Sequence, residues 1–172
     1  MLSQNLTDRT IEVKGIIWED FVNYKKPCMT LMFPKCDFKC EKECGEAFCQ
    51  NSNLAATASQ TVDIDEVLDR YESNDITEAI VLQGLEPLDS LIDVYIVAAA
   101  LRRHKITDDF IIYTGYTPSE IKPFIVIQNL SSLVPGHLII KWGRYLPNQS
   151  PHYDPVLGIN LASNNQYGEL IK

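Results

Sequence analysis

The chain has 172 residues, which is enough for one domain with a sizeable hydrophobic core. Its 45% hydrophobic and 22% charged residues are typical of a soluble globular protein, and its formal charge of −8 argues against nucleic-acid binding as a main role. No segment approaches the roughly 20 apolar residues of a membrane span, and residues 1–10 lack the features of a secretory signal. We therefore expect a cytoplasmic protein with reduced thiols and no membrane association.

Two strands are predicted near the start of the chain, at residues 11–18 and 28–33. Both segments are apolar and are bounded by polar residues. The next predicted element is a helix, for which Asp63 and Glu66 form a capping box. The apolar residues behind this cap follow helical spacing: they are Ile64, Val67, Leu68 and Tyr71.

The remainder of the chain alternates between strand and helix patterns. Strands are predicted at residues 79–84, 110–115 and 137–143, where the sequence is apolar without alternation. After the first of them, one helix face is predicted from Leu88, Leu91, Ile92, Tyr95, Ile96 and Ala99. After the second, residues 117–120 (TPSE) supply an N-cap, a first-turn proline and a returning glutamate for another helix.

Uniformly apolar strands that alternate with helices indicate an α/β fold, in which helices cover a mostly parallel sheet. We predict one such domain over residues 1–172. Ligands of parallel sheets bind beyond the carboxyl ends of the strands. Unusual sequences follow four predicted strands: the cysteines after Phe33, GLEP after Leu82, TGYT after Tyr113 and GRY after Trp142. The pattern therefore predicts a single crevice where these strand ends converge.

Four of the five cysteines are crowded into one short segment: Cys36, Cys40, Cys44 and Cys49. Three thiolates can hold a cubane [4Fe–4S] cluster and leave its fourth iron open, whereas a structural zinc site uses four closed ligands. Spacing alone leaves open a cluster, a zinc site and unligated thiols. The fifth cysteine, Cys28, lies within an apolar strand and is expected to be a small buried side chain.

The cysteine segment resembles the signature loop of radical S-adenosylmethionine (SAM) enzymes, whose usual pattern is CxxxCx-aromatic-C. Cys36 and Cys40 have the first spacing, and Cys49 follows an aromatic residue, Phe48. CQNS at residues 49–52 is similar to the Cys-x-Asn of small activases in this family. The resemblance implies Cys36, Cys40 and Cys49 as ligands of a [4Fe–4S] cluster and Phe48 near the adenine of SAM. Cys44 would lie in an insertion, as an alternate ligand.

Residues 83–87 (QGLEP) resemble the GGEP motif of the same family, whose backbone receives the amino group of SAM. The resemblance implies that Gly84, Leu85 and Glu86 contact the cofactor. Leu85 stands where the second glycine is usual. A glycine allows close backbone approach, and carbonyl or carboxylate oxygens can accept hydrogen bonds from an ammonium group.

The later segments resemble the anaerobic ribonucleotide reductase activating proteins. IIYTGYT (residues 111–117) is similar to their strand and turn, which implies that Tyr113 and Gly115 lie at the cofactor. KWGRYLP (141–147) and LASNNQYGEL (161–170) are similar to two further segments of that subgroup. Arg144 is expected either to neutralise the carboxylate of SAM or to form a surface ion pair.

The resemblance implies a small, open, partial (β/α) barrel of the radical SAM type. Its activity would be reductive cleavage of SAM, followed by formation of a glycyl radical on a partner. That partner would be the large subunit of an anaerobic ribonucleoside-triphosphate reductase, and the electrons would come from a low-potential donor such as flavodoxin. Two alternatives stay open: a radical SAM enzyme that acts on a small molecule or peptide, and a non-catalytic zinc module held by the four clustered cysteines.

Overall fold

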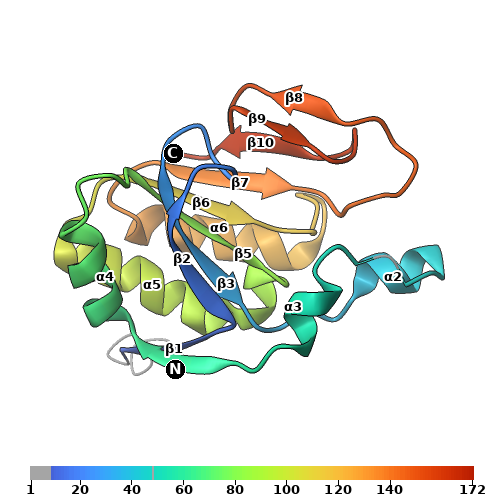
Figure 1. The fold of residues 1–172 in the computed structure, drawn as a ribbon. Helices are drawn as coiled ribbons and strands as arrows, with labels where there is room; N and C mark the ends of the chain where they lie inside the picture. Colours follow the sequence, from blue (N-terminus) through green and yellow to red (C-terminus); the bar gives the residue numbers. More distant parts are fainter. Residues whose placement is uncertain (1–8, 48) are drawn as a thin grey trace.

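The computed structural model describes residues 9–47 and 49–172, apart from the side chains of residues 121–124. A mixed six-stranded sheet has the order β10-β7-β6-β5-β3-β2 (Figure 1). Its strands are β2 (Gly15–Asp20), β3 (Cys28–Phe33), β5 (Ala79–Gly84), β6 (Asp109–Tyr113), β7 (Leu138–Trp142) and β10 (Tyr167–Leu170). The four central strands are parallel, and β2 and β10 are antiparallel edges. The predicted α/β class and parallel core are thus confirmed. The sheet of the described residues is open, not a closed barrel.

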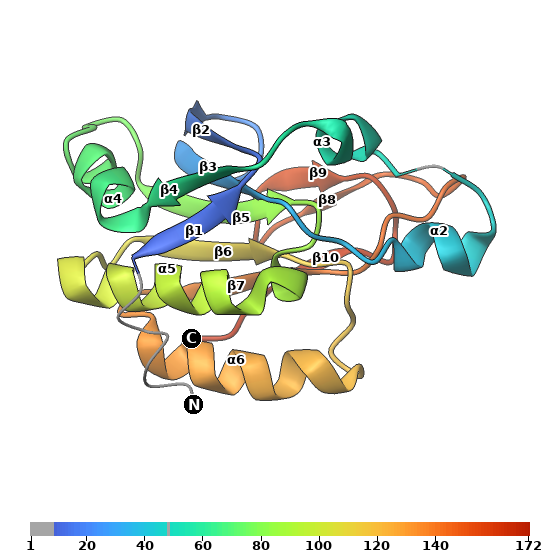
Figure 2. The same cartoon turned by 90° about the horizontal axis from the view of Figure 1, so that it is seen from below.

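One face of the sheet is covered by helices (Figures 1 and 2). They are α4 (Ile64–Glu72), α5 (Leu91–His104) and α6 (Ile121–Leu133), with a short 3-10 helix η1 (Pro87–Ser90) before α5. A ribbon of two antiparallel strands, β1 (Thr10–Val13) and β4 (Gln60–Asp63), packs against α5 on this side. Alternate strand residues such as Ile80, Leu82 and Trp142 join the main core between sheet and helices.

The opposite face of the sheet is covered by a hairpin of β8 (His152–Asp154) and β9 (Ile159–Leu161), and by the loop between β2 and β3. Val81, Ile111 and Ile139 point to this side, where they form a smaller core with residues that include Leu157 and Leu161. Because successive side chains of a strand point to opposite faces, a fully apolar strand contributes side chains to both cores.

The strand predicted at residues 11–18 is wrong in extent, because it divides into β1 and β2, which belong to different sheets. The change occurs at Lys14. Its backbone N–H donates to the Met32 carbonyl (2.7 Å), and its ammonium group donates to the carbonyls of Ala55 and Thr57. An apolar run does not reveal such a change of pairing partner.

The helix starts agree with the sequence in part. Asp63 caps α4 as predicted, since its carboxylate accepts from the backbone N–H groups of Asp65 (2.9 Å) and Glu66 (3.4 Å). In contrast, α6 begins at Ile121, so Thr117 lies about one turn ahead of the helix and is not its cap. The Thr117 N–H still donates to the Glu120 carboxylate, at 2.7 Å.

The helix face predicted from residues 88–99 is also partly wrong. Leu88 belongs to η1, and Ile92 is 56% exposed. The buried residues of α5 are instead Val94, Tyr95, Ile96, Val97, Ala98, Ala100 and Leu101. Helix α5 is buried on several sides because α4, β1 and α6 all contact it, and its buried residues join the core that lies against the sheet. Among the helices of the described residues, none is long and apolar enough to cross a bilayer.

Candidate metal centre and cofactor cavity

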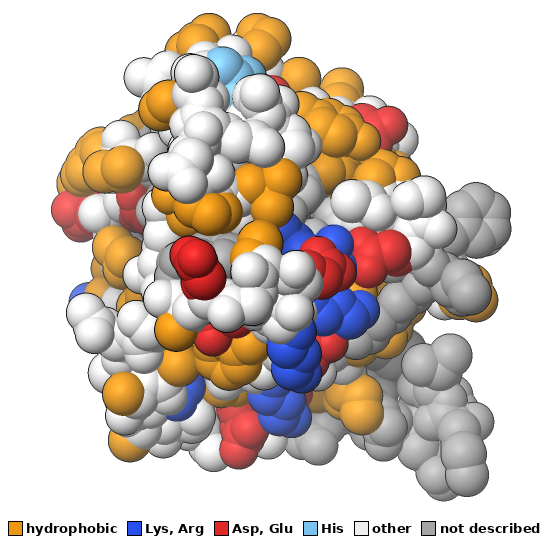
Figure 3. Space-filling model, turned by 90° about the vertical axis from the view of Figure 1, so that its right-hand side faces the viewer, with side chains coloured by type: hydrophobic (Ala, Val, Ile, Leu, Met, Phe, Trp, Pro, Cys, Tyr) orange, Lys and Arg blue, Asp and Glu red, His pale blue; other side chains and the backbone are white. Residues whose placement is uncertain are grey.

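A cavity of about 440 Å³ lies at the carboxyl ends of the parallel strands. Its walls come from the cysteine segment, from the turns after β5, β6 and β7, and from residues 159–162 of the β9 segment. Figure 3 views the molecule from this side, where basic and acidic side chains gather beside apolar ones. The predicted convergence of strand ends on one crevice is confirmed.

The turn after β5 is fastened to the start of the cysteine segment. The Leu85 N–H donates to the Phe33 carbonyl (3.1 Å), and the Glu86 N–H donates to the Lys35 carbonyl (2.8 Å). Gly84 has a φ of +104°, and a Cβ atom there would lie 2.7 Å from the Phe33 nitrogen. Glycine is therefore required at this position, both for its backbone conformation and for the close approach of β3.

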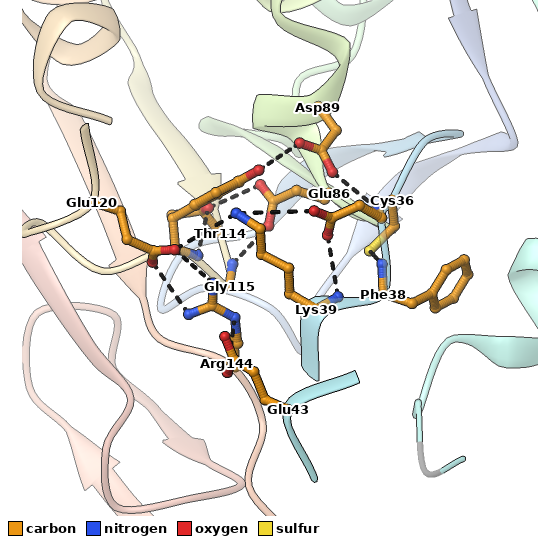
Figure 4. Close-up of polar contacts among 12 residues, drawn as sticks. Cys36, Phe38, Lys39, Glu43, Glu86, Asp89, Thr114, Gly115, Glu120 and Arg144 are labelled. Atoms are coloured by element: carbon orange, nitrogen blue, oxygen red, sulfur yellow. Dashed lines mark hydrogen bonds and ion pairs between the residues drawn. The ribbon is translucent and has the colours of Figure 1, made fainter. Parts of the chain in front are cut away.

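Glu86 joins the ends of β5 and β6 through its carboxylate (Figure 4). One oxygen accepts from the Thr114 hydroxyl (2.8 Å) and the Leu88 N–H (3.0 Å), and the other accepts from the Gly115 N–H (2.8 Å). The side chain is only 6% exposed. Burial raises the pKa of Glu86 to about 7, although these three donors favour the ionised form. The carboxylate thus shapes the cavity wall through protein contacts.

The cysteine segment forms two short helices, α2 (Lys39–Cys44) and α3 (Ser52–Ala56), neither of which contains a buried residue. Phe38, at φ 54°, precedes α2. The loop is held by three side-chain contacts. The Phe38 N–H donates to the Cys36 sulfur (3.2 Å), the Cys49 N–H donates to the Glu41 carboxylate (2.9 Å), and the Asn51 amide donates to the Gly84 carbonyl (2.7 Å). The last of these ties the loop to the turn after β5.

Three of the four clustered thiols line the cavity: Cys36, Cys40 and Cys49. Burial, together with negative charge on Glu86, Asp89 and Cys40, raises the pKa of Cys36 to about 12, although the hydrogen bond from the Phe38 N–H lowers it. Burial also raises the pKa of Cys40, with Cys49 as the next contributor. Cys40 is thus near enough to interact with Cys36 and with Cys49 when these thiols ionise, and a cation or cluster would favour their ionised forms.

The other two cysteines are placed differently. Cys44, at the end of α2, is exposed and does not line the cavity. Cys28 is fully buried on the hairpin side of the sheet, as predicted, and burial raises its pKa to about 12. Carboxylate oxygens of Asp37 and Asp89 lie within 4.8 Å of the Cys36 sulfur and are further potential metal ligands.

Arg144 is engaged by carboxylates at the mouth of the cavity (Figure 4). Its two terminal nitrogens contact the Glu120 carboxylate at 2.7 and 3.2 Å, and its Nε lies 3.7 Å from Glu43 of α2. Burial would raise the pKa of Glu120, but the guanidinium group and the Thr117 donors outweigh it and lower that pKa to about 2. Arg144 therefore links α2 to the turns after β6 and β7.

The cavity also contains a lysine that the sequence reasoning missed. Lys141 of β7 is 8% exposed and donates to the Gly143 carbonyl (2.8 Å). Burial lowers its pKa to about 8. The available signal was a single basic residue inside the apolar run LIIKW, because an unpaired charge in a buried strand is unusual.

The predicted site residues are brought together as a group. Those of the described chain that line the cavity are Cys36, Cys40, Cys49, Gly84, Leu85, Glu86, Tyr113, Gly115 and Arg144. Phe48 lies outside the described residues. Tyr113 donates its hydroxyl to the Asn23 carbonyl in the loop between β2 and β3. The assignment of each residue to a metal or cofactor stays a prediction.

Comparison with known families identifies the family to which the chain belongs. Residues 26–152 match the model of the 4Fe-4S single cluster domain family. The match covers most of the chain, including all five cysteines and the four parallel strands, so the chain belongs to this family and is an iron–sulfur protein. No curated protein and no solved structure matches the chain.

Proposed function

We propose that this chain is a radical SAM enzyme that generates a glycyl radical on an anaerobic ribonucleotide reductase. One observation carries the proposal: three thiols and the carboxyl ends of four parallel strands surround one cavity, in a chain of the 4Fe-4S single cluster domain family. Family membership favours a cluster over the zinc alternative. In this proposal the open sheet corresponds to a partial (β/α) barrel that forms a single domain.

The cysteines and the size of the cavity fit a [4Fe–4S] cluster with SAM bound to it. Cys36, Cys40 and Cys49 line the cavity while Cys44 does not, which supports three ligands and an open fourth iron. The cavity volume of about 440 Å³ falls within the range of roughly 300–1,000 Å³ usual for cofactor sites. A reduced [4Fe–4S] cluster with SAM bound would supply a low-potential electron and a carbon-centred radical, chemistry that no side chain can perform.

The residues of the chain prepare this site. Gly84 lets the backbone of the turn after β5 pass close to β3, and the Asn51 amide holds its carbonyl. Glu86 fixes the neighbouring turns and keeps the Thr114 hydroxyl in place. These contacts position backbone groups around the cavity before any ligand binds, which lowers the cost of binding.

The exposure of the cysteine segment supports a macromolecular partner. Helices α2 and α3 contain no buried residue, so a polypeptide loop could approach the cysteine segment from solvent. We propose the glycine loop of the reductase large subunit as that partner and a flavodoxin-type protein as electron donor, both in the cytoplasm.

Anaerobic reconstitution with iron and sulfide, followed by reduction in the presence of SAM, tests the proposal. We expect 5′-deoxyadenosine and methionine from the wild type and none from Cys40→Ala. Addition of the reductase should give a glycyl-radical signal by electron paramagnetic resonance. A reconstituted cluster that never cleaves SAM would refute the SAM chemistry. Cleavage without radical transfer to the reductase would instead favour a small-molecule or peptide substrate, and zinc without iron or sulfide would favour the metal module.

A further inference from the structure

Lys141 presents a buried positive charge to the cavity. Its side chain belongs to β7, and the residue is only 8% exposed. The ammonium group has three N–H donors, and the Gly143 carbonyl is its one hydrogen-bond partner among the described residues. No carboxylate of the described chain lies within ion-pair distance of it.

The other cations at the cavity already have carboxylate partners. Arg144 makes a two-point contact with Glu120, at 2.7 and 3.2 Å. The Lys39 ammonium lies 3.7 Å from Glu120 and 3.9 Å from Asp37. Lys141 is thus the cavity cation with donors to spare, and it is much better shielded from water than Lys39, whose side chain is 38% exposed.

The position of Lys141 is set from two sides. It pairs in register with Tyr113 at the end of β6, and its ammonium lies 5.9 Å from the centre of that ring. The Gly143 carbonyl that accepts its hydrogen bond also accepts from the amide of Gln166 (3.3 Å), a side chain that is 6% exposed. The ammonium is therefore held at the cavity wall before any ligand arrives.

The Glu86 carboxylate favours the charged form of Lys141, but it is not within ion-pair distance and is already bound by Thr114, Leu88 and Gly115. A buried ammonium group without a direct carboxylate partner in a cavity marks a site for an anion. We infer that Lys141 binds the carboxylate of the amino-acid part of SAM. The inference rests on the proposed function, and it assigns to Lys141 the role that sequence reasoning offered to Arg144. A desolvated cation strengthens this contact, because the local dielectric is low.

Equilibrium dialysis of the reconstituted protein in its oxidised state, at pH 7, tests the inference without catalysis. Two ligands are compared, SAM and decarboxylated SAM, which lacks the carboxylate. In Lys141→Met, SAM affinity should fall by about 10- to 100-fold while the affinity for decarboxylated SAM is unchanged. Lys141→Gln should behave in the same way, and Lys141→Arg should retain most of the preference for SAM. Iron and sulfide content confirms that each variant holds its cluster.

The outcomes separate the inference from the proposed function. If the wild type holds a cluster and binds no SAM, the proposed function fails. If it binds SAM and the Lys141→Met protein keeps the full preference for the carboxylate, the inference alone is overturned. It is also overturned if both ligands weaken equally, if Arg144→Gln and not Lys141→Met removes the preference, or if neither neutral variant assembles a cluster.

Discussion

The four clustered cysteines differ in their surroundings more than their close spacing suggests. The Cys36 sulfur accepts a hydrogen bond from the Phe38 N–H, and the Cys49 backbone N–H donates to the Glu41 carboxylate, so the first sulfur and the backbone at Cys49 are restrained at the cavity. Cys44 ends an exposed helix and has no such restraint at the cavity wall. Position at the cavity, which Cys36, Cys40 and Cys49 share, thus separates the expected ligands from the extra thiol.

Replacement of single cysteines should distinguish the three expected cluster ligands from Cys44. We expect Cys36→Ala, Cys40→Ala and Cys49→Ala to lose the cluster, because two thiolates cannot hold three irons. Cys44→Ala should retain the full complement. Iron and sulfide content after anaerobic reconstitution gives the answer. Cluster loss in Cys44→Ala together with retention in Cys49→Ala would reverse the assignment of the third ligand.

At the scale of elements, the contact between the ends of β3 and β5 is the tightest point of the site. Ala at position 84 would meet both a φ of +104° and the Phe33 nitrogen at 2.7 Å. We expect Gly84→Ala to lower the free energy of unfolding by about 2 kcal/mol or more. Gly45→Ala is the matched control, because Gly45 also has a positive φ (+72°) but no atom within 4 Å of the added Cβ.

In the control, Gly45→Ala, the free energy of unfolding should fall by only about 1 kcal/mol, which is the cost of the positive φ for a residue with a side chain. Denaturant unfolding of both variants separates the cost of the positive φ from the cost of the close approach of β3. Equal losses in the two proteins would show that the approach of β3 contributes nothing at Gly84.

Helices α4 and α5 are joined by a titratable contact. The His104 ring contacts Glu72 (2.7 Å) and Asp65 (3.1 Å). Burial would lower the pKa of His104, but these two carboxylates outweigh it and raise that pKa above its usual 6.5. The stabilisation is therefore fully present below about pH 6.5 and is lost as the pH rises through the raised pKa.

The stability difference between wild type and His104→Gln should be largest in mild acid and should shrink in alkali. Denaturant unfolding at about pH 6 and about pH 9 measures this difference, and the difference cancels other titrations common to both proteins. A difference that grows with pH would mean that neutral, not protonated, His104 stabilises the contact between the helices.

The elements best predicted from sequence are those whose pattern is local. Residues 28–33 and 79–84 are apolar on both sides, and each forms a strand with the predicted bounds. The division of residues 11–18 was missed because it depends on β4, which is far along the chain. The β8–β9 hairpin was missed for a related reason: its strands are only three residues each, and they are stabilised by packing on the sheet. Local pattern cannot report such distant packing.

The candidate site was predictable to the same degree. Strand-end placement predicted which segments meet, and the cavity brings them together. The pairing of Arg144 with Glu120, and the three donors on Glu86, depend on side-chain geometry that spacing does not contain. Glycine, cysteine and turn signals therefore located the site, whereas the partners of its charged side chains needed the structure.

At the scale of the whole molecule, the sheet is covered on both faces by unlike layers. Helices form the larger core, and the β8–β9 hairpin seals the other face with residues such as Leu157, which is completely buried. The hairpin is also tied to the loop between β2 and β3, where the Lys25 N–H donates to the Leu157 carbonyl (2.8 Å).

If this second layer stabilises the fold, Leu157→Ala should lower the free energy of unfolding by about 2–4 kcal/mol, since it removes buried apolar volume. Tyr153→Ala on the same hairpin is the control, because Tyr153 is 62% exposed and should change stability by less than about 0.5 kcal/mol. Denaturant unfolding compares them. A negligible effect of Leu157→Ala would show that the hairpin rests on the sheet without stabilising it.

The hairpin segment has a consequence for biogenesis. Residues 159–162 and Gln166 complete a cavity whose cysteines were synthesised long before them. A nascent chain that already contains Cys36, Cys40 and Cys49 therefore lacks one wall of the proposed cluster cavity. Until translation has passed Gln166, a cluster assembled on these thiols would lack the shielding that the complete cavity provides.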